Sequence, residues 1–548
     1  MYSIKAFQAV AGVASLFLEL INASPLAQIV DQRQSSTFTN PIRWEDMPDA
    51  DVFRIGDVFY YSSSTFAYSP GAPLYKSYDL ANWTPVTHSV PTLDFGDKYN
   101  LGTSNRAYVQ GIWASTVRYR ESTDTFYWIG CIEFSKTYIY TSSGSGAGAN
   151  NGEAASWNWQ KAGVIDKCYY DCGLLIDDDD SMYVAYGNTN ISVAQLSSDG
   201  LSEVSTQQVL SGGDVYIEGS HMYKINGYYW IIPTKVASGE WAYRATSPWG
   251  PYEQHVFFDN LPAPLSQAGW PHQGGIVDTQ AGNWYYVAFI DAFPGGRIPV
   301  MAPVGWDSEG WPYIVTNSSG GWATEYDMPV STSREVEPPG GLDTFTTLSD
   351  EWEWNHNPDT SSWNLVEGGG ITLKTATVTD DLYSARNTLT HRSLGPKSEA
   401  IFEFDISQMA DGDRAGAALF RDRSAYIGIH KSGDAATLVY VNGMDLIDGN
   451  WATASNGTIA ATGPTITDSV IYLKITADIT PALDADPVRP AIFSYSTDGT
   501  TWTQLGDPYL LVNTWSYFIG YRYAAFNFAT KSLGGSVTLK SFSMELVD

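Results

Sequence analysis

Five residues capable of chemistry or ligand recognition occur at matching places along the chain: Asp49, Trp113, Asp171, Glu218 and His272. Each lies 11 to 14 residues ahead of a tyrosine in a strand-like segment. Three carboxyl groups that meet where water is scarce cannot all ionise cheaply, so at least one stays protonated near neutral pH. Such a set supplies both a proton donor and an ionised base, which is the division of labour that glycoside hydrolysis requires.

The spacing of these residues predicts the elements that position them. Five times an apolar strand runs into a tight polar turn and then into a strand around a tyrosine. The tyrosines are 46 to 67 residues apart, at Tyr60, Tyr127, Tyr183, Tyr229 and Tyr285. Repeats of this length, made of short antiparallel strands, are typical of β-propeller blades. We therefore expect a five-bladed β-propeller whose innermost strands bring the five residues to one central funnel.

The carboxyl residues also have plainer explanations. A single aspartate before a strand is usually a turn residue, so Asp49 stands out only through its offset match with Asp171 and Glu218. Glu218 follows an apolar residue and precedes Gly219, and a carboxyl flanked in this way is costly to bury without a function. Asp51 is expected on the same face as Asp49 because side chains alternate along a strand.

The acidic run from Asp177 to Asp180 lies where the other repeats have their polar turns, such as Asn226-Gly227. Aspartate favours turns because it bonds to its own backbone. We expect a solvated hairpin turn here rather than a cation site.

Composition bounds the class of protein. A chain of 548 residues is too long for one core and should form about two domains. The formal charge of −30 argues against a nucleic-acid partner, since phosphate binding needs cationic surface. Aromatic residues make up 14% of the chain, which fits a β-rich core and also stacking on sugar rings.

The amino-terminal segment and the cysteines indicate secretion. Residues 1–23 resemble a signal peptide, and no later segment is long and apolar enough to span a membrane. Four glycosylation sequons of the expected mature chain agree with an extracellular location: Asn82, Asn190, Asn317 and Asn456. The three cysteines contain no Cys-x-x-Cys pair, so we expect no zinc site but one disulfide, Cys131–Cys168, and a buried thiol at Cys172.

The repeat pattern divides the mature chain. We expect the propeller over residues 24–335, a linker over 336–344 containing Pro-Pro-Gly-Gly, and a β-sandwich over 345–548. In the last region Ile471, Leu473 and Ile475 alternate with polar residues, and Phe542, Met544 and Leu546 form a similar pattern. Asp498-Gly499 predicts a hairpin.

The motif series resembles that of glycoside hydrolase family 43. The segments that carry the resemblance span residues 40 to 315 and are WEDMPDADVFRIGDVFYYSSSTFAYSPGAP, CYYDCGLLIDDDDSMYVAYG, YIEGSHMYKINGYY, ATSPWGPY, PHQGGIVDT and GGRIPVMAPVGWDSEGWP. The family often has proline after the first and second aspartates, where this chain has Ala50 and Cys172.

The resemblance implies a five-bladed propeller, an inverting mechanism and a role for each carboxyl. Asp49 would be the general base, Asp171 the pKa modulator and Glu218 the general acid. The substrate-binding residues would be Phe66 and Trp113, which line the subsite for the terminal sugar, with His272 and Arg297, which orient the acid or bind the sugar. No cofactor is implied as required, and the resemblance leaves open either a Ca²⁺ ion near His272 or a neutral imidazole hydrogen-bonded in the core.

The carboxy-terminal region is similar to the concanavalin-like sandwich attached to many β-xylosidases and arabinofuranosidases of this family. The segments that match are WEWNHNPDTSSWNL, SARNTLTHR and GDRAGAALFRD. Such a domain would either shape the pocket and bind polysaccharide or, as we favour, pack against the propeller and stabilise it. Asn355, His356 and Asn357 are expected to satisfy a turn rather than to form a site.

The motif series most resembles the fungal-type arabinofuranosidases of this family. Together with the other features, this resemblance implies a secreted, monomeric, inverting exo-glycosidase that removes terminal α-L-arabinofuranosyl residues from arabinoxylan. Its partners would be arabinoxylan or xylan oligosaccharides, with no nucleic acid and no membrane. A β-1,4-xylosidase that releases xylose from oligosaccharide ends, or a bifunctional enzyme, is the alternative. The motifs of fructan-cleaving propellers are missing from the sequence. A non-catalytic carbohydrate-binding propeller would repeat one pocket, whereas the five positions here differ in kind.

Overall fold

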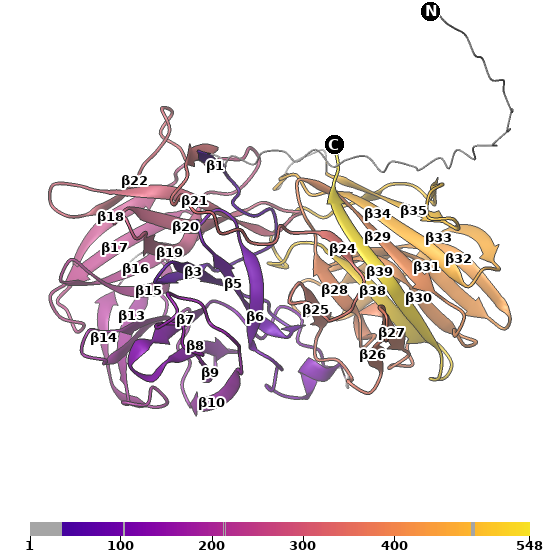
Figure 1. The fold of residues 1–548 in the computed structure, drawn as a ribbon, viewed down its shortest axis with the longest axis horizontal. Helices are drawn as coiled ribbons and strands as arrows, with labels where there is room; N and C mark the ends of the chain where they lie inside the picture. Colours follow the sequence, from indigo (N-terminus) through magenta and orange to yellow (C-terminus); the bar gives the residue numbers. More distant parts are fainter. Residues whose placement is uncertain (1–35, 102–104, 212, 214, 484–487) are drawn as a thin grey trace, which may run out of the picture. The chain divides into compact units, whose positions relative to one another are not determined.

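The computed structural model describes residues 36–101, 105–211, 213, 215–483 and 488–548. The segment expected as a signal peptide lies outside these residues. The described chain is built almost entirely of strands, with three short 3₁₀ helices at η1 (Asp97–Asn100), η2 (Glu121–Thr123) and η3 (Leu382–Ser384) (Figure 1). Within the described ranges, no helix is both long enough and apolar enough to cross a membrane.

Five four-stranded antiparallel sheets form the blades of the predicted propeller, each running from an inner to an outer strand in chain order. Blade 1 consists of β2 (Asp51–Ile55), β3 (Val58–Ser62), β5 (Gly71–Ser77) and β6 (Thr84–Val90). Blade 2 consists of β7 (Ser115–Arg120), β8 (Thr125–Ile132), β9 (Lys136–Ser143) and β10 (Gln160–Ile165). Blade 3 consists of β11 (Gly173–Ile176), β12 (Met182–Tyr186), β13 (Asn190–Leu196) and β14 (Glu203–Ser211). Blade 4 consists of β15 (Ile217–Ile225), β16 (Tyr228–Lys235), β17 (Gly239–Ala245) and β18 (Glu253–Asp259). Blade 5 consists of β19 (His272–Asp278), β20 (Trp284–Asp291), β21 (Arg297–Trp306) and β22 (Pro312–Ile314).

Tight turns join the first two strands of each blade, as the repeat predicts. Between β15 and β16, Asn226 and Gly227 both have positive φ, the backbone region that suits asparagine and glycine. The acidic run from Asp177 to Asp180 forms the turn between β11 and β12, which confirms the expected hairpin. Asp177 also bonds Lys224 and Tyr229 of the neighbouring blade, so the turn braces blades 3 and 4.

The ring closes between blade 5 and blade 1. Strand β1 (Thr37–Thr39) pairs with β23 (Glu325–Asp327), which follows the fifth blade. The amide side chain of Asn40 donates to the carbonyl of Met301 in β21 and accepts from its backbone N–H. Apolar side chains of β2 and β3 pack in one cluster with those of β20 and β21. The first and last blades are therefore held together by these contacts, although they are far apart in the sequence.

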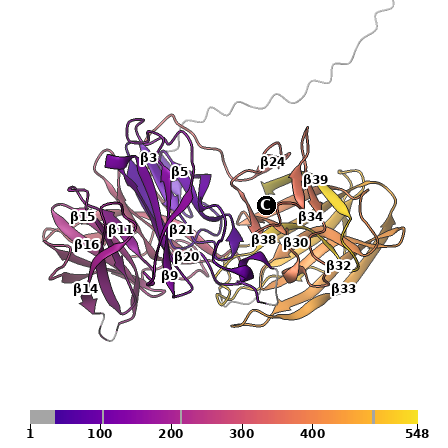
Figure 2. The same ribbon diagram turned by 90° about the horizontal axis from the view of Figure 1, so that it is seen from below.

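The carboxy-terminal part forms two large antiparallel sheets. The first holds β24 (Gly341–Asp343), β26 (Trp363–Leu365), β27 (Ile371–Lys374), β29 (Lys397–Asp405), β34 (Val470–Asp478), β35 (Pro490–Ser496), β36 (Thr503–Gln504), β37 (Tyr509–Leu510) and β39 (Ser536–Leu546). The second holds β25 (Trp352–Asn355), β28 (Leu389–Arg392), β30 (Asp413–Phe420), β31 (Arg423–Ser432), β32 (Ala435–Leu446), β33 (Thr453–Ile466) and β38 (Arg522–Ala529), together with β4 (Tyr68–Ser69). Figure 2 shows β34 and β39 in one layer and β30, β32 and β38 in the other.

The sandwich core follows the predicted alternation. Ile471, Leu473 and Ile475 are fully buried between the sheets, and burial of each contributes roughly 1.5–3 kcal/mol. Asp498-Gly499 joins β35 to β36 as expected. Phe542 and Met544 are buried, but Leu546 is 58% exposed because the core ends before the last residue of β39. Strand β24 falls within the segment expected as a linker and pairs with β39.

The second sheet of the sandwich includes a piece of the propeller. Strand β4, from the connection between β3 and β5, pairs with β25. Nearby, Glu353 is completely buried and bonds Arg392, Arg522 and His88. Burial alone would raise the pKa of Glu353, but the two arginines outweigh it and hold that pKa well below its ordinary value. The two domains thus share both a sheet and a buried ionic cluster.

Candidate active site

The five residues predicted to converge lie at the same end of the five inner strands. Asp49 precedes β2, Trp113 precedes β7 and Asp171 precedes β11. Glu218 is the second residue of β15, and His272 is the first of β19. The offset between repeats thus corresponds to one structural position in each blade.

Asp49 forms a two-pronged ion pair with Arg297, the first residue of β21. The guanidinium nitrogens lie 2.7 and 3.3 Å from its two oxygens. The hydroxyl of Ser64 donates a further hydrogen bond at 2.5 Å. Asp49 has a φ of 58°, a strained value for a residue with a side chain, and both partners are buried. These contacts fix the position of the Asp49 carboxyl group ahead of β2.

Asp171 and Glu218 lie close enough to repel each other. Burial raises the pKa of Asp171 well above its ordinary value, and the charges of Glu218 and Asp49 raise it further. Burial also raises the pKa of Glu218, with a contribution from Asp49, although a hydrogen bond from Tyr170 opposes it. Two of the three carboxyls therefore favour the protonated form at pH values where isolated carboxyls ionise.

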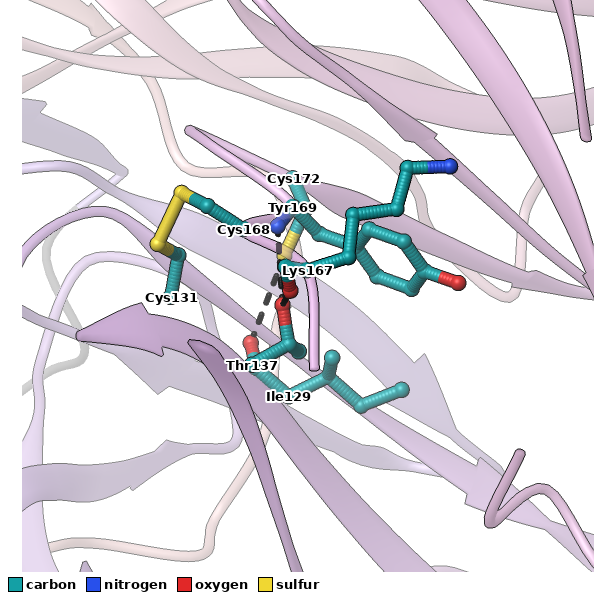
Figure 3. Close-up of a disulfide and its surroundings, with 7 residues drawn as sticks. All are labelled: Ile129, Cys131, Thr137, Lys167, Cys168, Tyr169 and Cys172. Carbon is teal, nitrogen blue, oxygen red and sulfur yellow. Dashed lines mark hydrogen bonds between the residues drawn. A yellow bond between two sulfur atoms is a disulfide. The ribbon is translucent and has the colours of Figure 1, made fainter. Parts of the chain in front are cut away.

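The loop that carries Asp171 is fastened to blade 2. A disulfide joins Cys131 in β8 to Cys168, which confirms the expected pair, and Cys172 is the buried free thiol. Figure 3 shows the hydroxyl of Thr137 beside this disulfide, where it donates to the carbonyl of Lys167 and accepts from the N–H of Tyr169. These contacts hold the backbone immediately before Asp171.

Aromatic rings surround the ion pair of Asp49 and Arg297. Phe66 lies beneath the guanidinium at 5.7 Å and packs against Trp113 at 6.3 Å. Phe518, which comes from the sandwich, stacks on Phe66 at 6.2 Å. The predicted binding residues Phe66, Trp113 and Arg297 are therefore brought together, with a sandwich residue as a fourth partner.

A cavity of about 670 Å³ adjoins these rings. It is lined by Val109, Gln110, Gly111, Trp113, Glu133, Phe134, Asp448, Gly449, Trp451, Trp515, Ser516 and Phe518. The three carboxyls are not in its lining, but Phe134 stacks on Tyr170, whose hydroxyl bonds Glu218. The sandwich thus shapes the space next to the site, in addition to packing against the propeller.

His272 is linked to Arg297 through the ring of Phe289. Its ring packs edge-on against Phe289 at 4.4 Å, and the guanidinium of Arg297 lies 5.0 Å from the same phenyl ring. The Nδ1 atom lies 2.8 Å from the carbonyl oxygen of Trp270. Among the described residues, no group of three or more His, Cys, Asp or Glu side chains could hold a metal ion. The arrangement supports the hydrogen-bonded imidazole and gives no ligand set for Ca²⁺ at His272.

Asp46, three residues before Asp49, connects the loop of Asp49 to the sandwich. One of its oxygens accepts from the backbone N–H of Arg297 at 2.7 Å, and the other accepts from that of Gly520 at 3.1 Å. Its carbonyl accepts from Arg392, and Arg297 donates to the carbonyl of Phe518. Arg297, the ion-pair partner of Asp49, is therefore held by the sandwich twice: directly through Phe518 and through Asp46, which bonds Gly520.

Asp51 does not share the surroundings of Asp49, contrary to the expected alternation. Its carboxylate bonds Arg118 and the backbone N–H of Val117, and it lies 3.3 Å from His221. The reason is the positive φ of Asp49, which lies before β2 and breaks the period of the strand. Asp51 instead joins the inner strands of blades 1, 2 and 4.

Asn355, His356 and Asn357 are buried and bonded to propeller loops. Asn355 donates to the hydroxyl of Tyr108, and His356 accepts from the backbone N–H of Ala107. Asn357 bonds both backbone groups of Leu93 and the hydroxyl of Ser69. These three residues have a structural role, as expected, but they join the two domains and do not merely satisfy a local turn.

Several residues of the site were missed from the sequence. Tyr170 bonds Glu218, and the position of this tyrosine directly before Asp171 is a signal that could have identified it. Asp46 and Phe518 carry no such signal, because their role depends on how the sandwich docks. The assembled groups can donate a proton, accept a proton and enclose an apolar ring face.

Comparisons with known proteins agree with this geometry. The sequence model of glycosyl hydrolases family 43 matches residues 38–312, and that of the β-xylosidase C-terminal concanavalin A-like domain matches residues 343–545. The chain is 54% identical to the solved structure of a family 43 glycoside hydrolase with an engineered active site, which displays both endo-xylanase and exo-arabinofuranosidase activity. That match covers 93% of this chain and 100% of the other, with a TM-score of 0.92.

Two curated relatives carry different names. A β-xylosidase of Formosa agariphila is 24% identical over 577 residues, which covers 93% of this chain and 90% of that protein. A non-reducing end α-L-arabinofuranosidase of Bacteroides ovatus is 29% identical over 360 residues, which covers 62% of this chain and 65% of that protein. From the family match and the 54% identity, the chain belongs to glycosyl hydrolase family 43.

Proposed function

We propose that this glycoside hydrolase is an inverting exo-enzyme that removes terminal α-L-arabinofuranosyl residues from arabinoxylan. The observation that carries the proposal is the contrast between two carboxyls at one site. Asp49 is paired with Arg297, whereas the pKa of Glu218 is raised by burial and by the charge of Asp49. Inverting hydrolysis needs one ionised and one protonated carboxyl on opposite sides of the glycosidic bond.

In this mechanism Glu218 donates its proton to the leaving oxygen while the bond to the sugar breaks. Asp49 removes a proton from the water that attacks the anomeric carbon from the other face. Asp171 and Glu218 repel each other when both are ionised, so the pair keeps one proton to a higher pH than an isolated carboxyl, and Asp171 acts as the modulator in this way. Arg297 and Ser64 hold Asp49 in position.

The cavity beside Trp113 supports a branched polysaccharide as substrate. A terminal sugar among Phe66, Trp113 and the carboxyls would leave the attached chain in the space of about 670 Å³ beside it. Its aromatic lining, including Trp451 and Trp515, suits the flat faces of pyranose rings. The β-xylosidase named among the relatives covers nearly the whole chain, so release of xylose from xylo-oligosaccharide ends is the second candidate.

Defined arabinoxylo-oligosaccharides test this proposal. We expect the wild-type enzyme to release arabinose faster than xylose, with the product in the inverted anomeric form. Glu218→Ala should lower kcat on the oligosaccharide by about 10²- to 10⁴-fold. An aryl arabinofuranoside with a good leaving group should lose less, because its departure needs little protonation. Equal rates for wild type and variant on both substrates would reject Glu218 as the acid, and xylose as the main product would favour the second candidate.

We also propose that the enzyme is secreted. The apolar segment within residues 1–23 and the Cys131–Cys168 disulfide both support an oxidising, extracellular location. Detection of the mature protein in culture medium, starting near Ser24, would test this.

A further inference from the structure

A buried carboxyl outside the proposed mechanism lies behind strand β15. Glu240, in β17, is completely inaccessible to solvent. In the sheet of blade 4, Thr234 pairs with Glu218 on one side and with Glu240 on the other. Glu240 is therefore on the same cross-strand row as the proposed general acid, two strands further out.

The backbone beside Glu240 departs from regular pairing. The ladder between β19 and β20 is interrupted between His272 and Gly275, and Gln273 there has a φ of 42°. The ladder between β15 and β16 is interrupted directly after Glu218. Bulges of this kind leave backbone groups without a ladder partner and re-aim the neighbouring side chains.

Glu240 supplies the partner that the blade 5 bulge lacks. Its Oε1 atom accepts a hydrogen bond of 2.5 Å from the N–H of Gln273, and the hydroxyl of Thr234 lies 3.3 Å from the same N–H. The side chain of Gln273 packs closely against Gly219. A Cβ atom added to Gly219 would lie 3.1 Å from the Cγ atom of Gln273. One carboxyl thus connects the residue after His272 with the residue after Glu218.

The surroundings of Glu240 suit a neutral carboxylic acid. Within the described chain, neither its Oε2 atom nor the hydroxyl of Tyr286, in β20, makes a hydrogen bond of regular geometry, although the two groups face each other closely enough to interact. Tyr223 of β15 is a further titratable group that interacts with it. No basic side chain of the described residues is within ion-pair distance. Burial raises the pKa of Glu240 well above its ordinary value of 4.5, against opposing hydrogen bonds from Thr234, Gln273 and Tyr286.

We propose that Glu240, as a neutral carboxylic acid, is a positioning residue that holds the bulge after His272 against β15 and so sets the orientation of Glu218. A protonated Glu240 accepts from Gln273 through one oxygen and donates from the other to Tyr286. The buried polar groups at this junction are then paired. The inference rests on the proposed role of Glu218 as the general acid.

Two substitutions at Glu240 test the role. Glu240→Gln keeps the acceptor and replaces the hydroxyl by another donor, so kcat should stay close to the wild-type value. Glu240→Ala leaves the Gln273 N–H with only the longer hydrogen bond to Thr234 and so loosens the bulge. Because a small misplacement of a reacting group is costly, kcat on an arabinoxylo-oligosaccharide should fall by about tenfold or more. Glu253→Gln, the same change at an exposed residue of β18, serves as the control.

The substrate separates positioning from general damage. With Glu240→Ala, an aryl arabinofuranoside with a good leaving group should lose much less activity than the oligosaccharide, and KM should change less than kcat. Equal losses on both substrates, a wild-type kcat in Glu240→Ala, or a loss in Glu240→Gln as large as in Glu240→Ala would each overturn the proposal.

Stability gives a readout that does not depend on the identity of the general acid. If the folded protein keeps Glu240 protonated above pH 4.5, it binds more protons than the unfolded chain, so its stability falls as the pH rises. Glu240→Gln lacks this loss. The free energy of unfolding of Glu240→Gln relative to wild type should therefore increase from about pH 5 to about pH 8. A difference that is constant or decreases with pH would overturn the neutral carboxyl even if Glu218 proves not to be the acid.

Discussion

The loop that carries Asp171 and the loop that carries Asp49 are fastened in different ways. The Asp171 loop is held within the propeller, by the Cys131–Cys168 disulfide and by Thr137. The Asp49 loop has propeller contacts as well, but it is additionally held by the sandwich, because Asp46 bonds Gly520. The propeller therefore holds the loop of the proposed modulator by itself, whereas the loop of the proposed base also has a contact with the second domain.

The position of each loop in the ring explains the difference. The Asp171 loop joins blades 2 and 3, which are consecutive in the chain, so nearby strands can hold it. The Asp49 loop lies where blade 5 meets blade 1, and its ion-pair partner Arg297 comes from the opposite end of the propeller sequence. There the sandwich fits closely: a Cβ on Gly520 would lie 2.0 Å from the carbonyl oxygen of Gly295. At Gly520 the sandwich therefore packs against the propeller so closely that no side chain would fit there.

The largest effect should come from removing the carboxylate that the sandwich helps to hold. Asp49→Asn cannot accept a proton from water, so kcat should fall by about 10²- to 10⁴-fold. Unlike the Glu218 variant, it should lose activity to a similar extent on the oligosaccharide and on an activated aryl arabinofuranoside, because both need the water. Steady-state kinetics on the two substrates would measure this. A variant that keeps its rate on the aryl substrate would contradict the base role.

Breaking the contact with the sandwich should have a smaller effect. Asp46→Ala leaves the N–H groups of Arg297 and Gly520 without acceptors, at about 1–3 kcal/mol for each buried group. Because Arg297 then holds Asp49 less firmly, kcat should fall by about 10- to 100-fold at temperatures where the variant is folded. Kinetics and thermal denaturation would be measured together, with Asp178→Ala in the exposed β11–β12 turn as control. A wild-type kcat would show that the propeller holds Asp49 without help.

Within the propeller-held loop, the clearest effect should be on pH dependence. The charge of Glu218 raises the pKa of Asp171, and the interaction is reciprocal. In Asp171→Asn the pKa of Glu218 should fall, so the acid loses its proton at lower pH. The alkaline limb of the kcat profile should move down by about one unit, and activity above that limb should fall by about tenfold. A limb that stays in place or moves to higher pH would contradict the modulator role.

The two loops also differed in how well they could be predicted. The repeat places Asp49, Asp171 and Glu218 in register because each lies at the start of an inner strand or just before it, and the pairing of Cys131 with Cys168 follows from their positions near strand ends. The contact of Asp46 with Gly520 joins residues 474 positions apart and follows no period. It depends on how two domains dock, which neither local propensity nor spacing encodes.

Side-chain direction could be predicted only where the strand was regular. Alternation correctly placed Ile471 and Leu473 in the core, since β34 is unbroken. It failed at Asp51, because the backbone at Asp49 adopts a positive φ just before β2. Glu240 was missed for a similar reason: its partner Gln273 is exposed to it by a bulge. The alternation of apolar and polar residues therefore does not predict side-chain directions where the backbone at a site is irregular.

Removal of the disulfide should have the smallest effect on catalysis. In the double variant Cys131→Ser and Cys168→Ser the Asp171 loop keeps both bonds to Thr137, and the carbonyl of Asp171 still accepts from Ser220. We therefore expect kcat at 25 °C to change little. The free energy of unfolding should fall by about 3–4 kcal/mol, because the bond closes a loop with a sequence separation of 37. Comparison with Asp46→Ala is the decisive measurement: a similar loss of stability should accompany a large loss of kcat there and almost none here. If the cysteine variant loses kcat as Asp46→Ala does while still folded, the hydrogen bonds to Thr137 and Ser220 are not enough to hold Asp171. Both loops would then depend on a contact that the blade repeat does not supply.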